Sequence, residues 1–376
     1  MIEKPIPAVL VSSTNALAGS GGGVQICTAE YRAVLAAAGF RLETMPFGVD
    51  MRLFVRVQRK FEGMPYRRIF PPDLQGRIMQ KVAEVNARFV FFNLHDFTPV
   101  AKALKTELGD RVKLVHLSHG VESTDISIRQ QVERTESGAV RCDRASGKEL
   151  GTALQWEADY RRYLDASLCL TPFDAQLERW LGVPSTAWFP RTAQRRLLDF
   201  RPVDGRVGCV GTLSHPPNRI GLQALFEKLK LMAAPPFHFR LVGGPETEGR
   251  AFAQEYSFVQ YLGPLPEDRL IEEVKSWCSF VHPIFHVAKG CSTKLAVALG
   301  WGLPIASTCL GARGYIWDES AVPLADTDKG LADGTIKRSK AKDFEMHRRE
   351  SMNVLGLQPK VEDVSREVRR YLLSLE

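Results

Sequence analysis

Short apolar runs alternate along the first half of the chain with longer segments in which apolar residues recur every three or four positions. The short runs, rich in β-branched and aromatic residues, predict buried strands, whereas the longer period predicts helices. The predicted strands are Ala8–Thr14, Phe89–Leu94, Val112–Leu117 and Ser167–Thr171. The clearest helical pattern runs from Val24 to Ala38 and is closed by Gly39. Alternation of this kind indicates a parallel sheet flanked by helices.

The same rhythm starts again at Arg206. Strands are predicted at Val207–Val210, His238–Val242, Phe258–Leu262, Ser279–Pro283 and Pro304–Ser307, and helices at Ile220–Met232, Glu267–Ser276 and Thr293–Trp301. The proline-containing segment Phe173–Asp204 is predicted to connect the two halves. We therefore expect an α/β protein with two doubly wound domains, residues 1–187 and 188–355.

Two further segments do not belong to this rhythm. Residues 356–376 predict an amphipathic helix because apolar side chains recur at Val361, Val364, Val368, Tyr371 and Leu372. Residues 122–150 are polar and charged and contain Gly138 and Gly147. We expect a surface loop at 122–150, with a functional lid as the alternative.

The composition agrees with two folded domains and adds a charge to be explained. The chain has 376 residues, 44% of them hydrophobic, which suffices for two cores. Its formal net charge of +7 suits an anionic partner such as nucleotide phosphates, an anionic membrane surface or nucleic acid. The alternative is a basic soluble protein that has no such partner.

Cysteine usage and the N-terminus indicate a cellular location. None of the seven cysteines forms a Cys-x-x-Cys pair and several lie in apolar runs, which indicates buried thiols in a reducing compartment rather than disulfides or a zinc site. The first seven residues do not resemble a signal peptide, and no apolar run reaches the roughly 20 residues of a membrane span. We expect a cytoplasmic protein whose membrane contact, if it has one, is peripheral on the inner face of a membrane.

Three segments follow predicted strands and begin predicted helices, where α/β proteins bind ligands. The first contains Gly22 and Gly23, which could admit a ligand to a helix N-terminus, although neither the Walker spacing nor G-x-G-x-x-G is present. A plain strand-to-helix turn is the alternative. The second, KGCSTK at 289–294, offers Ser292 or Thr293 as a helix cap and Lys294 as a charge. A capped helix end with a lysine suits a diphosphate, and an ordinary helix with surface lysines is the alternative.

The third segment is VGTLSHPPNR at 210–219. A strand ends at Gly211, and Asn218 and Arg219 stand at the start of the next predicted helix. Arginine matches the geometry of phosphate oxygens, whereas a surface arginine without a ligand is the alternative.

In this order, four segments of the second half resemble the retaining GT-B-fold glycosyltransferases of family four. They are VGCVGTLSHPPNRIGLQAL (207–225), FRLVGGP (239–245), VQYLGPLPE (259–267) and VHPIFHVAKGCSTKLAVALGWGLPIASTCLGARG (281–314). In the first half, GSGGGV (19–24) resembles the glycine loop of that family. VKLVHLSHG (112–120) resembles the strand that ends in its sugar-contacting histidine, here His119.

The resemblance implies a GT-B fold whose last helix returns to the N-terminal domain. It implies a donor-binding set consisting of Gly22, Gly23, Gly211, Thr212, Asn218, Gly244, Gly263, Gly290, Ser292 and Thr293. Lys294 and Arg219 would stabilise the leaving diphosphate, His119 would hold the sugar, and domain closure would exclude water. No Asp-x-Asp motif stands in the loops concerned, so we expect no metal and no other cofactor.

One departure from the family pattern bears on activity. The family has two glutamates eight positions apart, one for the sugar and one for the ribose, and the aligned residues here are Lys289 and Val297. We expect transfer of a sugar from a nucleoside-diphosphate sugar to a hydroxyl acceptor, in glycan, polysaccharide or glycolipid biosynthesis. The alternatives are a catalytically degenerate GT-B binding module and a glycosyltransferase acting on nucleic acid, for which no binding module is visible.

A basic segment at 48–72 is the candidate for the acceptor or a membrane. Arginines and lysines there are interleaved with apolar residues, and four fall at helical spacing: Arg52, Arg56, Arg59 and Lys60. A basic face of this kind suits an anionic bilayer or a lipid-linked acceptor. A solvated helix face and a nucleic-acid contact are the alternatives.

Overall fold

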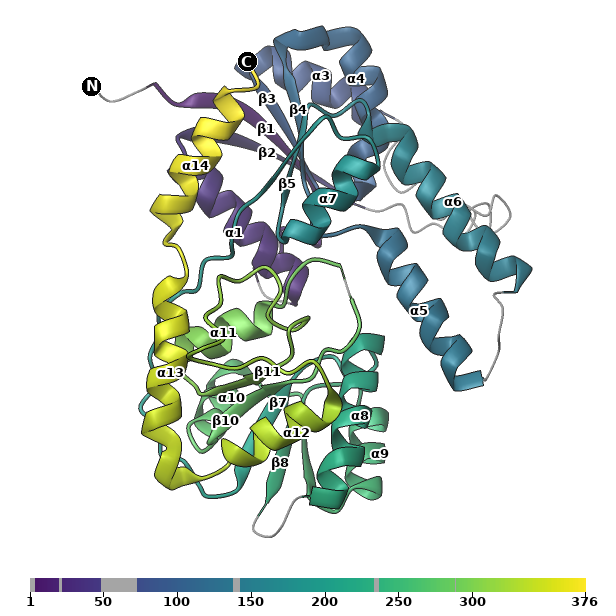
Figure 1. The fold of residues 1–376 in the computed structure, drawn as a ribbon. Helices are drawn as coiled ribbons and strands as arrows, with labels where there is room; N and C mark the ends of the chain where they lie inside the picture. The colour runs from purple at the N-terminus through teal and green to yellow at the C-terminus, as the bar shows by residue number, and fades with distance from the viewer. Residues whose placement is uncertain (1–3, 20–21, 49–72, 138–142, 233–236, 288) are drawn as a thin grey trace. The chain divides into compact units, whose positions relative to one another are not determined.

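The computed structural model describes residues 4–19, 22–48, 73–137, 143–232, 237–287 and 289–376. The chain divides into two compact units. Unit 1 comprises Met1–Pro190, Ala288–Gly290 and Lys360–Glu376, and unit 2 comprises Arg191–Val287 and Cys291–Pro359. Each unit has its own parallel sheet flanked by helices (Figure 1) and is described by itself.

The sheet of unit 1 has six parallel strands in the order β2-β1-β3-β4-β5-β6. The strands are β1 (Ile6–Ser13), β2 (Phe40–Phe47), β3 (Phe89–Asn93), β4 (Lys113–Leu117), β5 (Ala166–Cys169) and β6 (Ser185–Trp188). Because β2 lies on one side of β1 and β3 on the other, the winding reverses between β1 and β3. At such a switch point, open α/β sheets leave a crevice at the carboxyl ends of the strands.

Unit 1 also contains helices, among them the last helix of the chain. They are α1 (Gly23–Ala37), α3 (Leu74–Val85), α4 (Ala101–Leu108), α5 (Glu122–Ser137), α6 (Arg144–Arg161), α7 (Pro172–Trp180) and α14 (Val361–Leu373), with the 3-10 turns η1 (His95–Val100) and η2 (Gly109–Arg111). Strand β3 is buried at every position, as a central parallel strand must be. Helix α14 buries Val368 and Leu372, and Arg369 donates a 2.7 Å hydrogen bond to the Ala38 carbonyl after α1.

The sheet of unit 2 has five parallel strands in the order β11-β10-β7-β8-β9. The strands are β7 (Arg206–Val210), β8 (His238–Val242), β9 (Val259–Gly263), β10 (Ser279–His282) and β11 (Ile305–Ser307). The helices are α8 (Pro216–Met232), α9 (Glu246–Glu255), α10 (Glu267–Val274), α11 (Thr293–Trp301), α12 (Asp328–Lys337) and α13 (Phe344–Leu357), with the turn η3 (Ala341–Asp343). The switch point of this sheet lies between β7 and β10.

Helix α8 packs unusually close to the end of β10. A Cβ added at Gly221 would lie 1.6 Å from the carbonyl oxygen of Pro283, so only glycine fits there. On its inner face α8 buries Phe226, whose ring meets that of Phe239 edge-on with a centroid distance of 4.7 Å. The helix is thereby packed closely against the sheet from its second turn onward.

The α/β architecture with two doubly wound sheets is confirmed, and the predicted strands agree with the observed ones to within two residues at each end.

The surface loop predicted at 122–150 is wrong. Most of that segment belongs to α5 and α6, two helices that lie side by side (Figure 1). Polar contacts link them, including Arg129 to Glu149 at 2.7 Å and the Gln130 amide to the Ser146 carbonyl at 2.8 Å. Neither helix shows a marked apolar stripe, so the sequence pattern did not reveal them.

The predicted connection Phe173–Asp204 is wrong in its first half. That half contains most of α7 and all of β6, the edge strand of the sheet in unit 1. Strand β6 has four half-buried residues, too few for an alternating pattern to be visible in the sequence. The segment without helix or strand begins at Phe189 and runs to the start of β7.

Candidate functional site

In unit 1 the candidate site lies at the carboxyl edge of the sheet, beside the switch point between β1 and β3. Gly22 is the N-cap of α1 and contributes no side chain to the N–H groups of the first helical turn. Both Gly22 and Gly23 are exposed. This end of α1 therefore keeps the partial positive charge that suits an anionic or strongly polar ligand.

His119, two residues beyond β4, is half-buried at the same edge. Its Nε2 lies 2.9 Å from Oδ1 of Asn93, the last residue of β3. The amide nitrogen of Asn93 in turn lies 2.8 Å from the hydroxyl of Ser12 and 2.9 Å from that of Thr28. The ring of Tyr31 lies 5.7 Å from the imidazole, tilted by 49°. The imidazole is thus held on one edge by an amide and neighboured by an aromatic ring.

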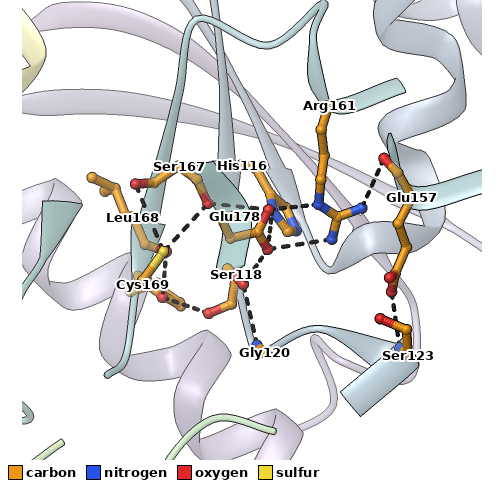
Figure 2. Close-up of polar contacts among 11 residues, drawn as sticks. His116, Ser118, Gly120, Ser123, Glu157, Arg161, Ser167, Leu168, Cys169 and Glu178 are labelled. Atoms are coloured by element: carbon orange, nitrogen blue, oxygen red, sulfur yellow. Dashed lines mark hydrogen bonds and ion pairs between the residues drawn. The ribbon is translucent and has the colours of Figure 1, made fainter. Parts of the chain in front are cut away.

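The backbone that carries His119 is tied to a buried polar network (Figure 2). The hydroxyl of Ser118 lies 2.8 Å from the Glu178 carboxylate and accepts the N–H of Gly120 at 3.2 Å. Glu178 also receives a 2.6 Å bond from Nε of Arg161. Gly120 has φ of +102°, a left-handed value that favours glycine. The turn on either side of His119 is therefore fixed by hydrogen bonds and by backbone conformation.

The electrostatics of this network are those of a structural ion pair. Burial alone would raise the pKa of Glu178, but Arg161 and His116 outweigh burial and hold that pKa far below its usual range. Burial also raises the pKa of Cys169 well above that of a free thiol, so this cysteine stays protonated. These side chains are buried, so they can support the loop after β4 but cannot contact a substrate.

In unit 2 three predicted residues meet at the switch point between β7 and β10. A Cβ added at Gly211 would lie 2.5 Å from Nζ of Lys294 and 3.3 Å from Nδ2 of Asn218. Asn218, in the first turn of α8, donates a 2.8 Å bond to the carbonyl of Thr212. Lys294, in the first turn of α11, thus lies beside both Gly211 and the start of α8. Two helix N-termini and an ammonium group make this part of unit 2 electropositive.

Within the ranges that the structure describes, no carboxylate pairs with Lys294. Its ammonium has no hydrogen bond or ion pair with any residue that the structure describes, and burial lowers its pKa. Nearby, burial and the charges of Lys294 and Arg313 hold the pKa of His282 well below its usual value, so His282 is neutral at physiological pH. A half-buried cation without a counter-ion is unfavourable, and an anionic ligand would relieve it.

The start of α11 is capped as the sequence predicts. Ser292 is the N-cap, and its hydroxyl accepts the Leu295 N–H at 3.4 Å. Thr293 is the first helical residue and is buried. The carbonyl of Ser292 accepts a hydrogen bond from the hydroxyl of Tyr315. The helix end that carries Lys294 is therefore held by the Ser292 cap and by the hydrogen bond from Tyr315.

The remaining predicted donor-binding residues divide between the two units. Thr212, Gly244 and Gly263 lie at the carboxyl ends of β7, β8 and β9, and Arg219 is half-buried in the first turn of α8. Gly290 and its neighbour Lys289 instead belong to unit 1.

Lys289 is ion-paired inside unit 1. Its N–H donates to the carboxylate of Asp125 at 2.9 Å, and its ammonium contacts Glu122. Burial lowers the pKa of Lys289, but these two carboxylates outweigh burial, so its pKa is raised. Val297, the second position at which the family pattern has glutamate, is exposed on α11.

Some predicted features are not described. Arg52, Arg56, Arg59 and Lys60 lie outside the described residues. Among the residues that are described, no group of three or more His, Cys, Asp and Glu side chains could hold a metal ion. No helix in the described ranges is long and apolar enough to cross a membrane.

Sequence reasoning missed Asn93 and the pair Arg161–Glu178. Asn93 left a usable signal, because it is the single polar residue of the run FVFFN and stands one position before the end of the predicted strand Phe89–Leu94. Arg161 and Glu178 left none, since they stand on different helices and only the fold places them together.

Comparison with known proteins agrees on the fold. The sequence matches no model of a known protein family, and a search of curated proteins finds no match. Among solved structures, sucrose-phosphate synthase from Thermosynechococcus elongatus is 16% identical, with a TM-score of 0.68 over 98% of this chain and 99% of that chain. HepE from Anabaena, solved with UDP, is 14% identical, with a TM-score of 0.63 over 98% and 100%. The lipopolysaccharide outer core galactosyltransferase WaaB is 12% identical, with a TM-score of 0.60 over 98% and 99%.

These solved structures are GT-B glycosyltransferases, and they match this chain over nearly its full length. The chain therefore has the GT-B fold, the class in which each of two Rossmann-like domains is built on a parallel sheet. Identities of 12–16% establish the fold alone.

Proposed function

We propose that the protein is a glycosyltransferase that moves a sugar from a nucleoside-diphosphate sugar to a hydroxyl acceptor. The observation that carries the proposal is Lys294, a half-buried ammonium beside Gly211 and Asn218 at the switch point of unit 2, for which the described part of the chain supplies no counter-ion. A diphosphate supplies the missing anion. Its charge grows as the bond to the sugar breaks, so Lys294 would stabilise the transition state more than the ground state.

The two candidate sites suit different parts of such a donor. We assign the diphosphate to unit 2, where Lys294, Asn218, Arg219 and the N-termini of α8 and α11 are available. We assign the sugar to the edge of unit 1 that carries His119, because an imidazole can hydrogen-bond a sugar hydroxyl. Retention of configuration and independence of divalent metal are part of the proposal. Retention follows from the resemblance to family four, and metal independence rests on the absence of an Asp-x-Asp motif from the loops concerned.

Uridine nucleotides are the first donors to test. HepE was solved with UDP, and also with UDP and glucose. The pneumococcal O-GlcNAc transferase GtfA, 13% identical, was solved with UDP and GlcNAc. For this chain we propose a glycan or lipid-linked acceptor, in polysaccharide or glycolipid biosynthesis, used in the cytoplasm or at the inner face of a membrane.

A thermal-shift screen followed by a transfer assay tests the proposal. UDP-, GDP-, ADP-, CMP- and dTDP-sugars are added in turn, and the donor that binds should raise the melting temperature. Release of the nucleoside diphosphate from that donor, with and without sugar acceptors, then measures turnover. Absence of a shift with every nucleotide sugar would overturn the assignment of unit 2 to a diphosphate.

A catalytically degenerate binding module is the second candidate. It is favoured by Lys289 and Val297 at the positions of the two family glutamates: Lys289 is engaged with acidic residues of α5, and valine cannot bond a ribose hydroxyl. The screen separates the candidates. A nucleotide sugar that raises the melting temperature but is neither transferred nor hydrolysed would identify the binding module.

A further inference from the structure

We propose that Asn93 is a positioning residue that fixes both the orientation of His119 and the location of its proton. In the neutral ring the proton then sits on Nε2, and Nδ1 is a hydrogen-bond acceptor. The inference rests on the proposed function only where it assigns that acceptor to a hydroxyl group of the donor sugar.

The first step of the argument is the hydrogen-bond capacity of the Asn93 amide. The side chain of Asn93 is fully buried at the end of β3. Its nitrogen carries two N–H groups and has two partners, the hydroxyls of Ser12 at 2.8 Å and Thr28 at 2.9 Å. Both hydroxyls are buried as well. Both N–H groups of the amide are thereby bonded to side chains of β1 and α1.

The second step concerns the other end of the amide. Oδ1 of Asn93 lies 2.9 Å from Nε2 of His119. A carbonyl oxygen only accepts, so Nε2 must carry a hydrogen. In neutral histidine the lone pair is then on Nδ1, because the bond at one ring nitrogen decides the state of the other. Rotating the amide by 180° would reverse both roles, so the location of the proton is a direct test of the arrangement.

The third step separates Asn93 from the groups that merely support the loop. The Tyr31 hydroxyl lies 2.8 and 2.9 Å from the carbonyl oxygens of Ser118 and Leu168 and shares its one hydrogen between them, and Glu178 holds the Ser118 side chain. These contacts fix the backbone next to His119, whereas the bond from Asn93 reaches Nε2 of the imidazole itself.

The chemical consequence is a choice between acceptor and donor. A neutral ring with its proton on Nε2 can accept a hydrogen bond from a sugar hydroxyl at Nδ1, whereas a protonated ring can only donate. Replacing the Asn93 amide with a carboxylate would stabilise the imidazolium and remove the acceptor. Asn93→Asp is nearly the same size as the native side chain, so it changes the charge with little change in packing.

The test is ¹⁵N nuclear magnetic resonance of histidine-labelled, ligand-free full-length protein over a pH series. The chain has eight histidines, and His119→Gln identifies the signals of His119. In the wild type we expect the neutral ring to show a protonated Nε2 and an unprotonated Nδ1. In Asn93→Asp we expect the pKa of His119 to rise by about 1–3 units, with both nitrogens protonated at neutral pH. In Asn93→Ser, which lacks the carbonyl, we expect a mixture of the two neutral forms.

A matched control is Ser185→Ala. Ser185 is a half-buried polar residue of the same sheet, bonded to the Tyr371 hydroxyl at 2.7 Å. It starts β6 and so stands at the amino edge, opposite the edge that carries His119. The spectrum of His119 should be unchanged in this variant. Two results would overturn the inference. One is a neutral wild-type ring that carries its proton on Nδ1, and the other is a His119 spectrum that neither Asn93 variant changes.

Transfer kinetics then link the positioning to function. At neutral pH, kcat/KM of Asn93→Asp should fall roughly ten- to hundredfold, and it should recover as the pH is raised above the new pKa of His119. A general loss of structure would not recover in this way. If the spectra behave as expected but no nucleotide sugar is used by the wild type, the proposed function fails and the role of Asn93 in setting the ring stands. If sugar is transferred but the spectra do not respond, the inference alone fails.

Discussion

The two lysines of the segment KGCSTK differ in their counter-ions. Lys289 is engaged by Glu122 and Asp125, so its charge is already neutralised within the protein. Lys294, five residues later, has no such partner among the described residues and lies beside the glycine that ends β7. The two lysines of this short segment therefore differ in their surroundings. Of the two, only Lys294 is placed to bind an anion.

Lys294→Ala should lower turnover about a hundredfold, equivalent to about 3 kcal/mol of transition-state stabilisation. The melting temperature without ligand should change little, whereas the increase caused by a nucleoside diphosphate should largely disappear. Steady-state kinetics and thermal shift with UDP measure the two effects. Lys329→Ala is the control, because Lys329 is likewise the second residue of a Thr- or Ser-capped helix in unit 2 but is exposed on α12. Equal activity of the two alanine variants would contradict the assignment.

Glu178→Gln should destabilise unit 1 by about 3–5 kcal/mol, because it leaves Arg161 charged, buried and without its anion. Urea unfolding followed by a probe in unit 1 measures the change. Glu84→Gln, at an exposed pair with Lys81 in the same unit, should change stability by less than about 0.5 kcal/mol.

The lowered pKa of Glu178 also predicts how the stability of unit 1 depends on pH. The pKa of Glu178 is lower in the folded protein than in the unfolded chain. Its contribution to stability is therefore fully present above the unfolded value, about pH 4.3, and is lost as the pH falls from there towards the folded value. Wild-type unit 1 should lose stability over that range, and the Gln variant should lose less. Parallel acid-unfolding curves for the two proteins would argue against the network as described.

At the scale of elements, helices hold their positions in two ways. Helices α5 and α6 are joined by polar contacts such as Arg129–Glu149, whereas α14 buries an apolar face and bonds the end of α1 through Arg369. The apolar face is visible in the sequence as a regular repeat. The polar contacts are not, which is why α14 could be predicted and α5 could not.

Leu372→Ala should cost about 2–5 kcal/mol, because this side chain of α14 is fully buried and its loss leaves a cavity. Limited proteolysis should then release the C-terminal segment before the rest of unit 1 is cut. Leu357→Ala, at an exposed leucine that ends α13, is the control and should leave both stability and the digestion pattern nearly unchanged. Similar losses in the two variants would show that α14 is not held by its buried face.

At the scale of the whole molecule, the two units are built on the same plan of a doubly wound parallel sheet. Each unit winds a parallel sheet outward in both directions from one strand, β1 or β7, and each has its candidate residues at the carboxyl edge beside the switch point. In unit 1 these residues are neutral hydrogen-bonding groups around His119. In unit 2 they are cationic, with Lys294 and Arg313 close to a neutral His282.

Transfer should continue within about twofold in excess EDTA, because protein cations in unit 2 would neutralise the leaving diphosphate in place of a divalent ion. Initial rates with EDTA, with added magnesium and with added manganese measure this. Lys294→Ala assayed with magnesium is the companion experiment, since a metal that substitutes for Lys294 would restore part of its activity. Loss of wild-type activity in EDTA, with recovery on adding either metal, would contradict metal independence.

The sequence by itself determined the two parallel sheets and the positions of most strands. Strands buried on both faces must be largely apolar, as in FVFF at 89–92, and a glycine must stand where a helix approaches another backbone closely, as at Gly221. Lys294 and His119 as binding residues stay predictions from the sequence, made because α/β proteins bind ligands where strands end and helices begin.

Only the tertiary structure decided which polar groups meet. The bond from Asn93 to His119 joins residues 26 positions apart, and the pairing of Lys289 with Glu122 spans 167 positions. It also revealed β6 and the paired helices α5 and α6, whose sequences have no strong period. Apolar periodicity is a local property written along one element, whereas hydrogen bonds and ion pairs between elements depend on distances that exist only after the chain has folded.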